Sequence, residues 1–203
     1  MKLEMNSNLI KRILIALLGC ITLGAGIGMS IKVGIGVDSL SAFYTAIAKI
    51  TGLSDGTVTA LANAVMITLA LILYKKNVGI STVMFMLTSK WPIDFANKHF
   101  IHSDNLIVSI ILCIFSMALI ALGSELCIFS DLGADAYTAM TMGVGKRLKH
   151  EVKYTYIRWF FDITFLILAI ILKGEVGLGT AIAIALVGPM MKLFEKGLRK
   201  IIK

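Results

Sequence analysis

The chain has 203 residues, of which 58% are hydrophobic and 16% are charged, and its formal net charge is +8. Soluble domains carry about a quarter charged residues, and a soluble fold of this length could not bury so much apolar surface. The composition therefore predicts an all-α membrane protein, a single transmembrane domain over residues 1–203. The basic residues gather between apolar segments and at the chain ends, which is typical of cytoplasmic loops and argues against a nucleic-acid partner.

A helix needs about 20 mostly apolar residues to cross a bilayer. Six segments fit this requirement and are predicted to be transmembrane helices: residues 13–33, 57–74, 78–95, 106–129, 156–172 and 176–193.

Two further segments, residues 38–50 and 135–146, are moderately apolar but too short to cross. Each begins with Asp and has a Ser or Thr nearby, the pattern of a helix N-cap. We expect either short re-entrant helices, which need surrounding protein or a water-filled cavity, or interfacial helices at the membrane surface.

Basic residues form four groups, and with six spans all four fall on one side, the cytoplasm. The groups are Lys2, Lys11 and Arg12; Lys75 and Lys76; Lys146, Arg147, Lys149 and Lys153; and Lys196, Arg199, Lys200 and Lys203. Both termini are therefore predicted to be cytoplasmic. If the two short helices also crossed, the Lys75–Lys76 pair would move outside.

An internal repeat relates the two halves of the chain. Residues 36–39 (GVDS) recur as residues 133–136 (GADA), and residues 78–82 (VGIST) recur as residues 176–180 (VGLGT). Each unit reads span, short helix, span, span. An odd number of spans makes the units antiparallel, which predicts six transmembrane helices in a 3+3 inverted repeat with a site near the midplane.

The repeats occupy about residues 9–98 and 105–195, and a basic tail, residues 196–203, follows them. The halves would be related by a pseudo-two-fold axis, across which Asp38 and Asp135 approach each other. Two carboxylates in a low-dielectric cavity can bind a cation or share a proton. Each could also cap its own helix, and the two roles are compatible.

Arg158 and Asp162 are four residues apart in the fifth span and share a helix face. Charged side chains in a span usually face a cavity and mark function, although Arg158 lies near the helix start and could snorkel to the interface. Asn63 stands at the equivalent depth in the first half. The hydroxyls of Thr82 and Thr180 could face the site or bond within their own helices. The predicted substrate-binding residues are Asp38, Asn63, Thr82, Asp135, Arg158, Asp162 and Thr180.

Small residues let helices approach closely in lipid, and a Gly-Pro pair kinks or loosens a helix. The predicted structural or gating residues are Gly36, Gly133, Gly177, Gly179, Gly188 and Pro189. The three cysteines lie in apolar runs without CxxC spacing, which predicts buried small residues rather than a disulfide or metal site. We expect no cofactor and no enzyme activity, because no catalytic motif stands in a recognisable setting.

Four motifs of the second half follow one another in a specific order: residues 130–135 (SDLGAD), 156–162 (YIRWFFD), 174–180 (GEVGLGT) and 187–189 (VGP). In this order they resemble the YitT/YczE family of bacterial membrane proteins. Asp162 stands where the YczE branch usually has Glu, and Val37 stands where Pro or Gly often precedes the first acid. The resemblance implies a multi-pass protein of the bacterial inner membrane and supplies no substrate.

These patterns lead to the hypothesis of a small secondary transporter or channel for a small cationic or zwitterionic solute, with a polar site at the repeat interface. One alternative is a substrate-binding membrane subunit that needs an energising partner. Another is a regulatory or scaffolding membrane protein whose basic loops dock partners or anionic lipid. The expected partners are the lipid bilayer, the solute and either a second copy or an energising subunit.

Overall fold

The computed structural model describes residues 9–75, 78–148 and 154–201, and within these ranges the chain is helical with no strand. Several predicted basic residues lie outside the described ranges: Lys2, Lys76, Lys149, Lys153 and Lys203. The helices are α1 Leu9–Val33, α2 Ser39–Thr51, α3 Asp55–Tyr74, α4 Ile80–Thr88, α5 Lys90–His99, α6 Leu106–Phe129, α7 Ala136–Arg147, α8 Tyr154–Ile171 and α9 Leu178–Ile201. By length and composition, α1, α3, α6 and α9 can cross a membrane, so the protein is membrane-like, as the composition predicted.

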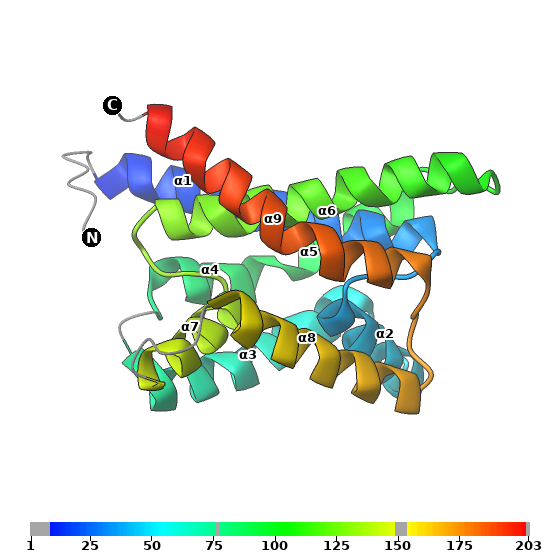
Figure 1. The fold of residues 1–203 in the computed structure, drawn as a ribbon, viewed down its shortest axis with the longest axis horizontal. Coiled ribbons are helices and arrows are strands. Elements are labelled where there is room, and N and C mark those ends of the chain that lie inside the picture. The colour runs from blue at the N-terminus through cyan, green and yellow to red at the C-terminus, as the bar shows by residue number, and fades with distance from the viewer. Residues whose placement is uncertain (1–8, 76–77, 149–153, 202–203) are drawn as a thin grey trace.

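The predicted third span, residues 78–95, is two helices rather than one, because the chain breaks at Ser89 between α4 and α5. Pro92 accounts for the break. It has no N–H to donate to the Thr88 carbonyl, and its ring would clash with that carbonyl in a continuous helix. Together α4 and α5 still lead the chain from one end of the molecule to the other (Figure 1).

The two short helices begin as their N-cap signals predict. Oδ2 of Asp38 accepts a 3.1 Å hydrogen bond from the N–H of Ser41 at the start of α2. Oδ2 of Asp135 accepts a 3.1 Å bond from the N–H of Thr138 at the start of α7. The capping role predicted for both carboxylates is therefore confirmed.

Helices α1 and α6 lie side by side and antiparallel, with α9 crossing over them (Figure 1). Glycine makes this close approach possible, because a Cβ at Gly26 would lie 2.9 Å from the Ser116 carbonyl oxygen. On the other side of the molecule, α3 packs against α7 and α2 packs against α8. Both described chain ends lie at the same end of the molecule, where α3 and α7 also finish (Figure 1).

The loop before α2 crosses the turn before α9 with backbone in direct contact. The N–H of Gly179 donates a 2.8 Å hydrogen bond to the carbonyl oxygen of Ile35. Gly36 has a φ of +106°, and a Cβ there would lie 2.6 Å from the nitrogen of Gly177. Only glycine fits both the conformation and the space. This crossing holds the N-terminus of α2 inside the molecule.

The loop before α7 crosses the turn before α4 in the same way. The N–H of Ser81 donates a 2.9 Å hydrogen bond to the carbonyl oxygen of Leu132. Gly133 has a φ of +109°, and a Cβ there would lie 2.6 Å from the nitrogen of Gly79. The segments that match in the sequence repeat thus make matching contacts, each between one half and the other.

Candidate functional site

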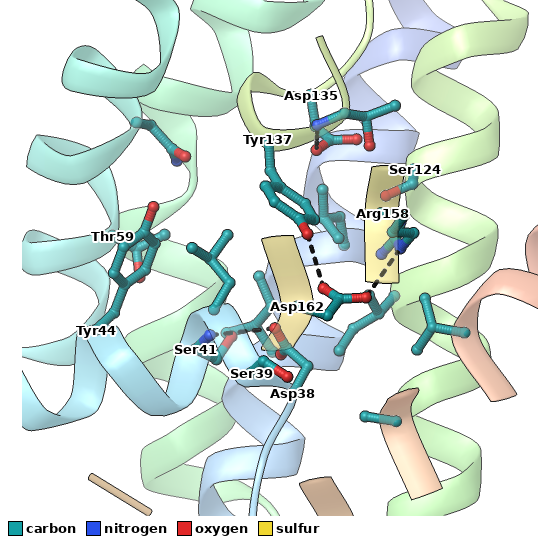
Figure 2. A pocket seen from close by; sticks show the side chains of 18 of the residues that line it. Asp38, Ser39, Ser41, Tyr44, Thr59, Ser124, Asp135, Tyr137, Arg158 and Asp162 are labelled. Carbon is teal, nitrogen blue, oxygen red and sulfur yellow. Dashed lines mark hydrogen bonds and ion pairs between the residues drawn. The ribbon is translucent and has the colours of Figure 1, made fainter. Parts of the chain in front are cut away.

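A polar cavity lies where α2 and α7 begin, enclosed by side chains of eight helices from both halves. Its volume is about 60 Å³, which is room for roughly four water molecules at about 15 Å³ each. Its polar lining consists of Asp38, Ser39, Ser41, Tyr44, Thr59, Asn63, Ser124, Asp135, Tyr137, Thr138, Arg158 and Asp162 (Figure 2). Five of the seven predicted substrate-binding residues therefore meet at one place.

The two matched aspartates line the cavity and use one carboxylate oxygen each for capping. Oδ1 of Asp38 and Oδ1 of Asp135 are buried, and neither has a hydrogen-bond partner among the described residues. Neither carboxylate has a basic partner within ion-pair distance in this part of the chain. Capping and cavity lining are thus combined in the same side chains.

Four more buried polar atoms of the lining have no hydrogen-bond partner among the described residues: Ser39 Oγ, Tyr44 Oη, Asn63 Nδ2 and Thr138 Oγ1. Leaving a buried polar group unsatisfied costs about 1–3 kcal/mol, so such groups rarely gather without a polar occupant. The concentration of these atoms around one cavity indicates a site that water or a polar ligand completes.

Asp162 is held by two neighbours, and Figure 2 shows it between Tyr137 and Arg158. The Tyr137 hydroxyl donates a 2.7 Å hydrogen bond to Asp162 Oδ1. Arg158 Nε lies 3.8 Å from Asp162 Oδ2, and its guanidinium stands 5.4 Å from the centre of the Tyr137 ring. Arg158 also donates to the Met191 sulfur at 3.0 Å, so it points into the protein rather than snorkelling to the surface.

The electrostatics of the cavity follow from these pairings. Arg158 is the one described base that lines the cavity; it pairs with Asp162 and also acts on Asp38, so one base stands beside the three carboxylates of Asp38, Asp135 and Asp162. A cavity with this surplus of negative charge favours a cation.

The other predicted residues lie outside this cavity. Thr82 Oγ1 accepts from the N–H of Gly79 at 3.1 Å and donates to the Ala134 carbonyl oxygen at 2.6 Å. Thr180 Oγ1 accepts from the N–H of Gly177 at 3.2 Å. The Thr82 hydroxyl therefore fastens α4 to the loop before α7, whereas the Thr180 hydroxyl caps the turn before α9.

The predicted glycines divide between two places. Gly36, Gly133, Gly177 and Gly179 form the backbone crossings themselves. Gly188 and Pro189 lie inside α9, which continues through them as a helix.

Comparison with known proteins places the chain in a family. A family described as a family of unknown function, DUF6198, matches residues 10–196. The chain belongs to this family. A Bacillus subtilis (strain 168) protein called "Uncharacterized protein YyaS" is 24% identical over 180 residues, which cover 87% of this chain and 89% of the relative. No solved structure matches. The family match includes both halves and every cavity residue, so the whole site belongs to the part that this DUF6198 member shares with its family.

Sequence reasoning missed three residues that the fold brings to this region of the DUF6198 protein. Tyr44 and Tyr137 line the cavity from the short helices α2 and α7. Glu125 lies in α6 and lines a neighbouring cavity of about 260 Å³. The sequence alone could have singled out Glu125, because it is the one acidic residue within the apolar segment 106–129. An ionisable residue inside a span is a functional candidate by default.

Proposed function

We propose that this protein is a small secondary transporter or channel that binds a small cationic or zwitterionic solute in the cavity between its two halves. One observation carries the proposal: Asp38 and Asp135, matched in the sequence repeat, line the same cavity, and each has a buried carboxylate oxygen without a hydrogen-bond partner among the described residues. A cation there would be attracted by both carboxylates, and this attraction is stronger in a low-dielectric cavity than in water.

The proposed topology is six spans in a 3+3 inverted repeat, with α4 and α5 together as the third span and α8 as the fifth. Its support is the antiparallel contact of α1 and α6 and the two matching crossings, Gly179 to Ile35 and Ser81 to Leu132. In this topology α2 and α7 are re-entrant helices that start at the cavity and run toward opposite membrane faces (Figure 1).

The basic groups favour a cytoplasmic location for both termini. The resemblance of the second-half motifs to the YitT/YczE family favours the bacterial inner membrane. Inverted repeats are common among transporters because exchanging the conformations of the two halves exposes one midplane site to each side in turn. A site built equally from both halves fits that mechanism.

The size and charge of the cavity narrow the solute class. A volume of about 60 Å³ holds an inorganic cation or an amine of few heavy atoms, with little hydration. A zwitterion would also need a partner for its carboxylate, and Arg158 could supply one only by turning from Asp162. The observed pairing therefore favours a simple cation.

A thermal-shift screen of the purified protein in detergent tests the proposal, with metal ions, small amines, amino acids and vitamins as probes. A ligand at 100 times its dissociation constant adds about 2.7 kcal/mol of apparent stability. We expect a cationic hit that the double variant Asp38→Asn, Asp135→Asn loses. Asp94→Asn is the matched control, because Asp94 accepts bonds from Ser54 and Gly56 away from the cavity.

Uptake of the hit into proteoliposomes then separates the candidate functions. Uptake that needs both aspartates supports a transporter or channel. Binding without uptake indicates a subunit that needs an energising partner, which co-purification with an ATPase would identify. No hit, with the double variant only less stable, would overturn the solute site and favour a regulatory or scaffolding role.

A further inference from the structure

A second cavity, of about 260 Å³, lies between α6, α8 and α9, and its lining includes Glu125, Arg158, Trp159, Asp162, Lys192 and Glu195. Glu125 is only 7% exposed, and its carboxylate forms no hydrogen bond or ion pair with the described residues. It lies four residues before the end of α6 at Phe129, about 6 Å along the helix axis. That end of α6 is the end of the molecule that holds both termini (Figure 1).

The two cavities share a wall. Arg158, Asp162 and Ile184 line both of them. The Arg158–Asp162 pair thus stands between the central polar cavity and Glu125. The 3.8 Å between Arg158 Nε and Asp162 Oδ2 exceeds the 2.7–2.9 Å of a charge-assisted hydrogen bond, so the two side chains form an ion pair at this distance without a hydrogen bond between these atoms.

Charged groups reach Glu125 from three elements. On α9, Glu195, Lys192 and Arg199 lie toward the end of the molecule that holds the termini, and Glu195 is already paired with Arg199 at 2.7 Å. Arg158 and Asp162 face it from α8, and Asp135 acts on it from the start of α7. Arg158 is the base that both Glu125 and Asp162 can reach from the wall of one cavity.

We propose that Glu125 is a proton-binding site in this second cavity, and that its protonation state decides whether Arg158 stays with Asp162 or turns to Glu125. This inference rests on the proposed function, because it assigns the proton as the coupling ion and the Arg158–Asp162 pair as the barrier beside the solute site.

The step is a proton exchange with water. When the carboxylate of Glu125 takes a proton from water in the second cavity, it becomes neutral and no longer attracts the guanidinium. Arg158 then remains with Asp162, as observed. When Glu125 releases the proton to water, its charge competes for Arg158 across the shared wall. The central cavity would then lose the positive charge of that wall and hold a cation more strongly.

Trp159 lines the second cavity beside Arg158 and supplies an optical probe. The chain has two tryptophans, so a Trp91→Phe background leaves Trp159 as the one emitter. The protein in lipid nanodiscs is titrated from about pH 4, where an ordinary glutamate titrates, to about pH 9, the upper end for a buried one. Trp159 emission and the infrared band of protonated carboxyl groups are recorded together.

We expect one step in Trp159 emission that coincides with loss of a carboxyl band. Glu125→Gln removes both signals, and Glu125→Asp retains a step at a displaced pH. Glu195→Gln is the matched control and retains both signals, because Glu195 lies in the same cavity but is paired with Arg199.

A double variant, Arg158→Gln with Asp162→Asn, tests the transmission through arginine. It should keep the infrared titration of Glu125 and lose the Trp159 step. The proposal is overturned if the step survives Glu125→Gln, is equally lost in Glu195→Gln, or persists without Arg158. Asp38→Asn with Asp135→Asn should retain the Trp159 step and the carboxyl band, at a displaced pH because the charge of Asp135 acts on Glu125, so failure of the solute site and failure of the proton site give different results.

Discussion

The backbone N–H of Gly179 donates a 2.8 Å hydrogen bond to the carbonyl oxygen of Ile35, which joins the start of α9 to the loop before α2. The equivalent bond in the other half runs from Ser81 to Leu132 at 2.9 Å. These two bonds fix where the loops turn back, and therefore where Asp38 and Asp135 point. The backbone of one half thus positions the acidic residue of the other.

Gly179→Ala should destabilise the protein by about 3 kcal/mol or more, because the new Cβ would overlap the Gly36 carbonyl oxygen and backbone would have to move. Gly197→Ala is the control, since Gly197 lies inside α9 with no proline after it, a Cβ there meets nothing within 4 Å and a helix-interior glycine gains about 0.5–1 kcal/mol on becoming alanine. Thermal unfolding midpoints in detergent measure both. Equal midpoints for the two variants would contradict the close crossing.

Sequence reasoning predicted the start of both short helices because capping is a local interaction. The segments 38–50 and 135–146 were expected to begin with a capping Asp, and α2 and α7 do begin after Asp38 and Asp135. The repeat also matched Gly36 with Gly133, and the two have nearly the same positive φ in the structure. The inverted six-span topology stays a prediction.

What the sequence could not predict depends on which face of each helix meets the others. Tyr44 and Tyr137 read as ordinary apolar residues of short helices, and only packing turns them to the cavity. The hydroxyls of Thr82 and Thr180 could face the site or bond within their own helices; in the structure each accepts a hydrogen bond from the glycine N–H three residues earlier.

Asp38→Asn and Asp38→Ala should separate charge from capping. Asparagine caps a helix about as well as aspartate, whereas alanine loses about 1 kcal/mol of capping stability. We therefore expect near wild-type stability for Asp38→Asn, a lower unfolding midpoint for Asp38→Ala, and loss of cation binding in both. Calorimetric titration with the cation found by screening measures binding. Wild-type affinity in Asp38→Asn would show that the carboxylate serves only as a cap.

The six-span topology predicts that Lys75 and Lys173 lie on opposite sides of the membrane. Both are exposed at opposite ends of the described structure, and Cys20, Cys113 and Cys127 are buried and thus shielded from labels. Single cysteines at the two positions are labelled with a membrane-impermeant maleimide in sealed, oriented vesicles. Labelling of Lys75→Cys only from the cytoplasmic side and of Lys173→Cys only from the other is expected; labelling of both from one side contradicts the inverted repeat.

Tyr137→Phe and Tyr44→Phe each remove a side-chain hydroxyl from the same cavity, and their effects on the stability of the protein should differ in sign. Tyr137 donates 2.7 Å to Asp162, and a hydrogen bond to a charged group contributes about 1.5–3 kcal/mol. Tyr137→Phe should therefore lower stability by about that amount while its ring stays under Arg158.

The hydroxyl of Tyr44 is buried without a partner among the described residues, so Tyr44→Phe in ligand-free protein should be neutral or stabilising, since it removes an unsatisfied polar group. Unfolding midpoints without and with the cation test the pair. A stabilising Tyr44→Phe that also weakens cation binding would mean that the hydroxyl is kept for the solute at a cost to the fold. A loss of stability equal to that of Tyr137→Phe would mean that the Tyr44 hydroxyl is already satisfied and takes no part in the site.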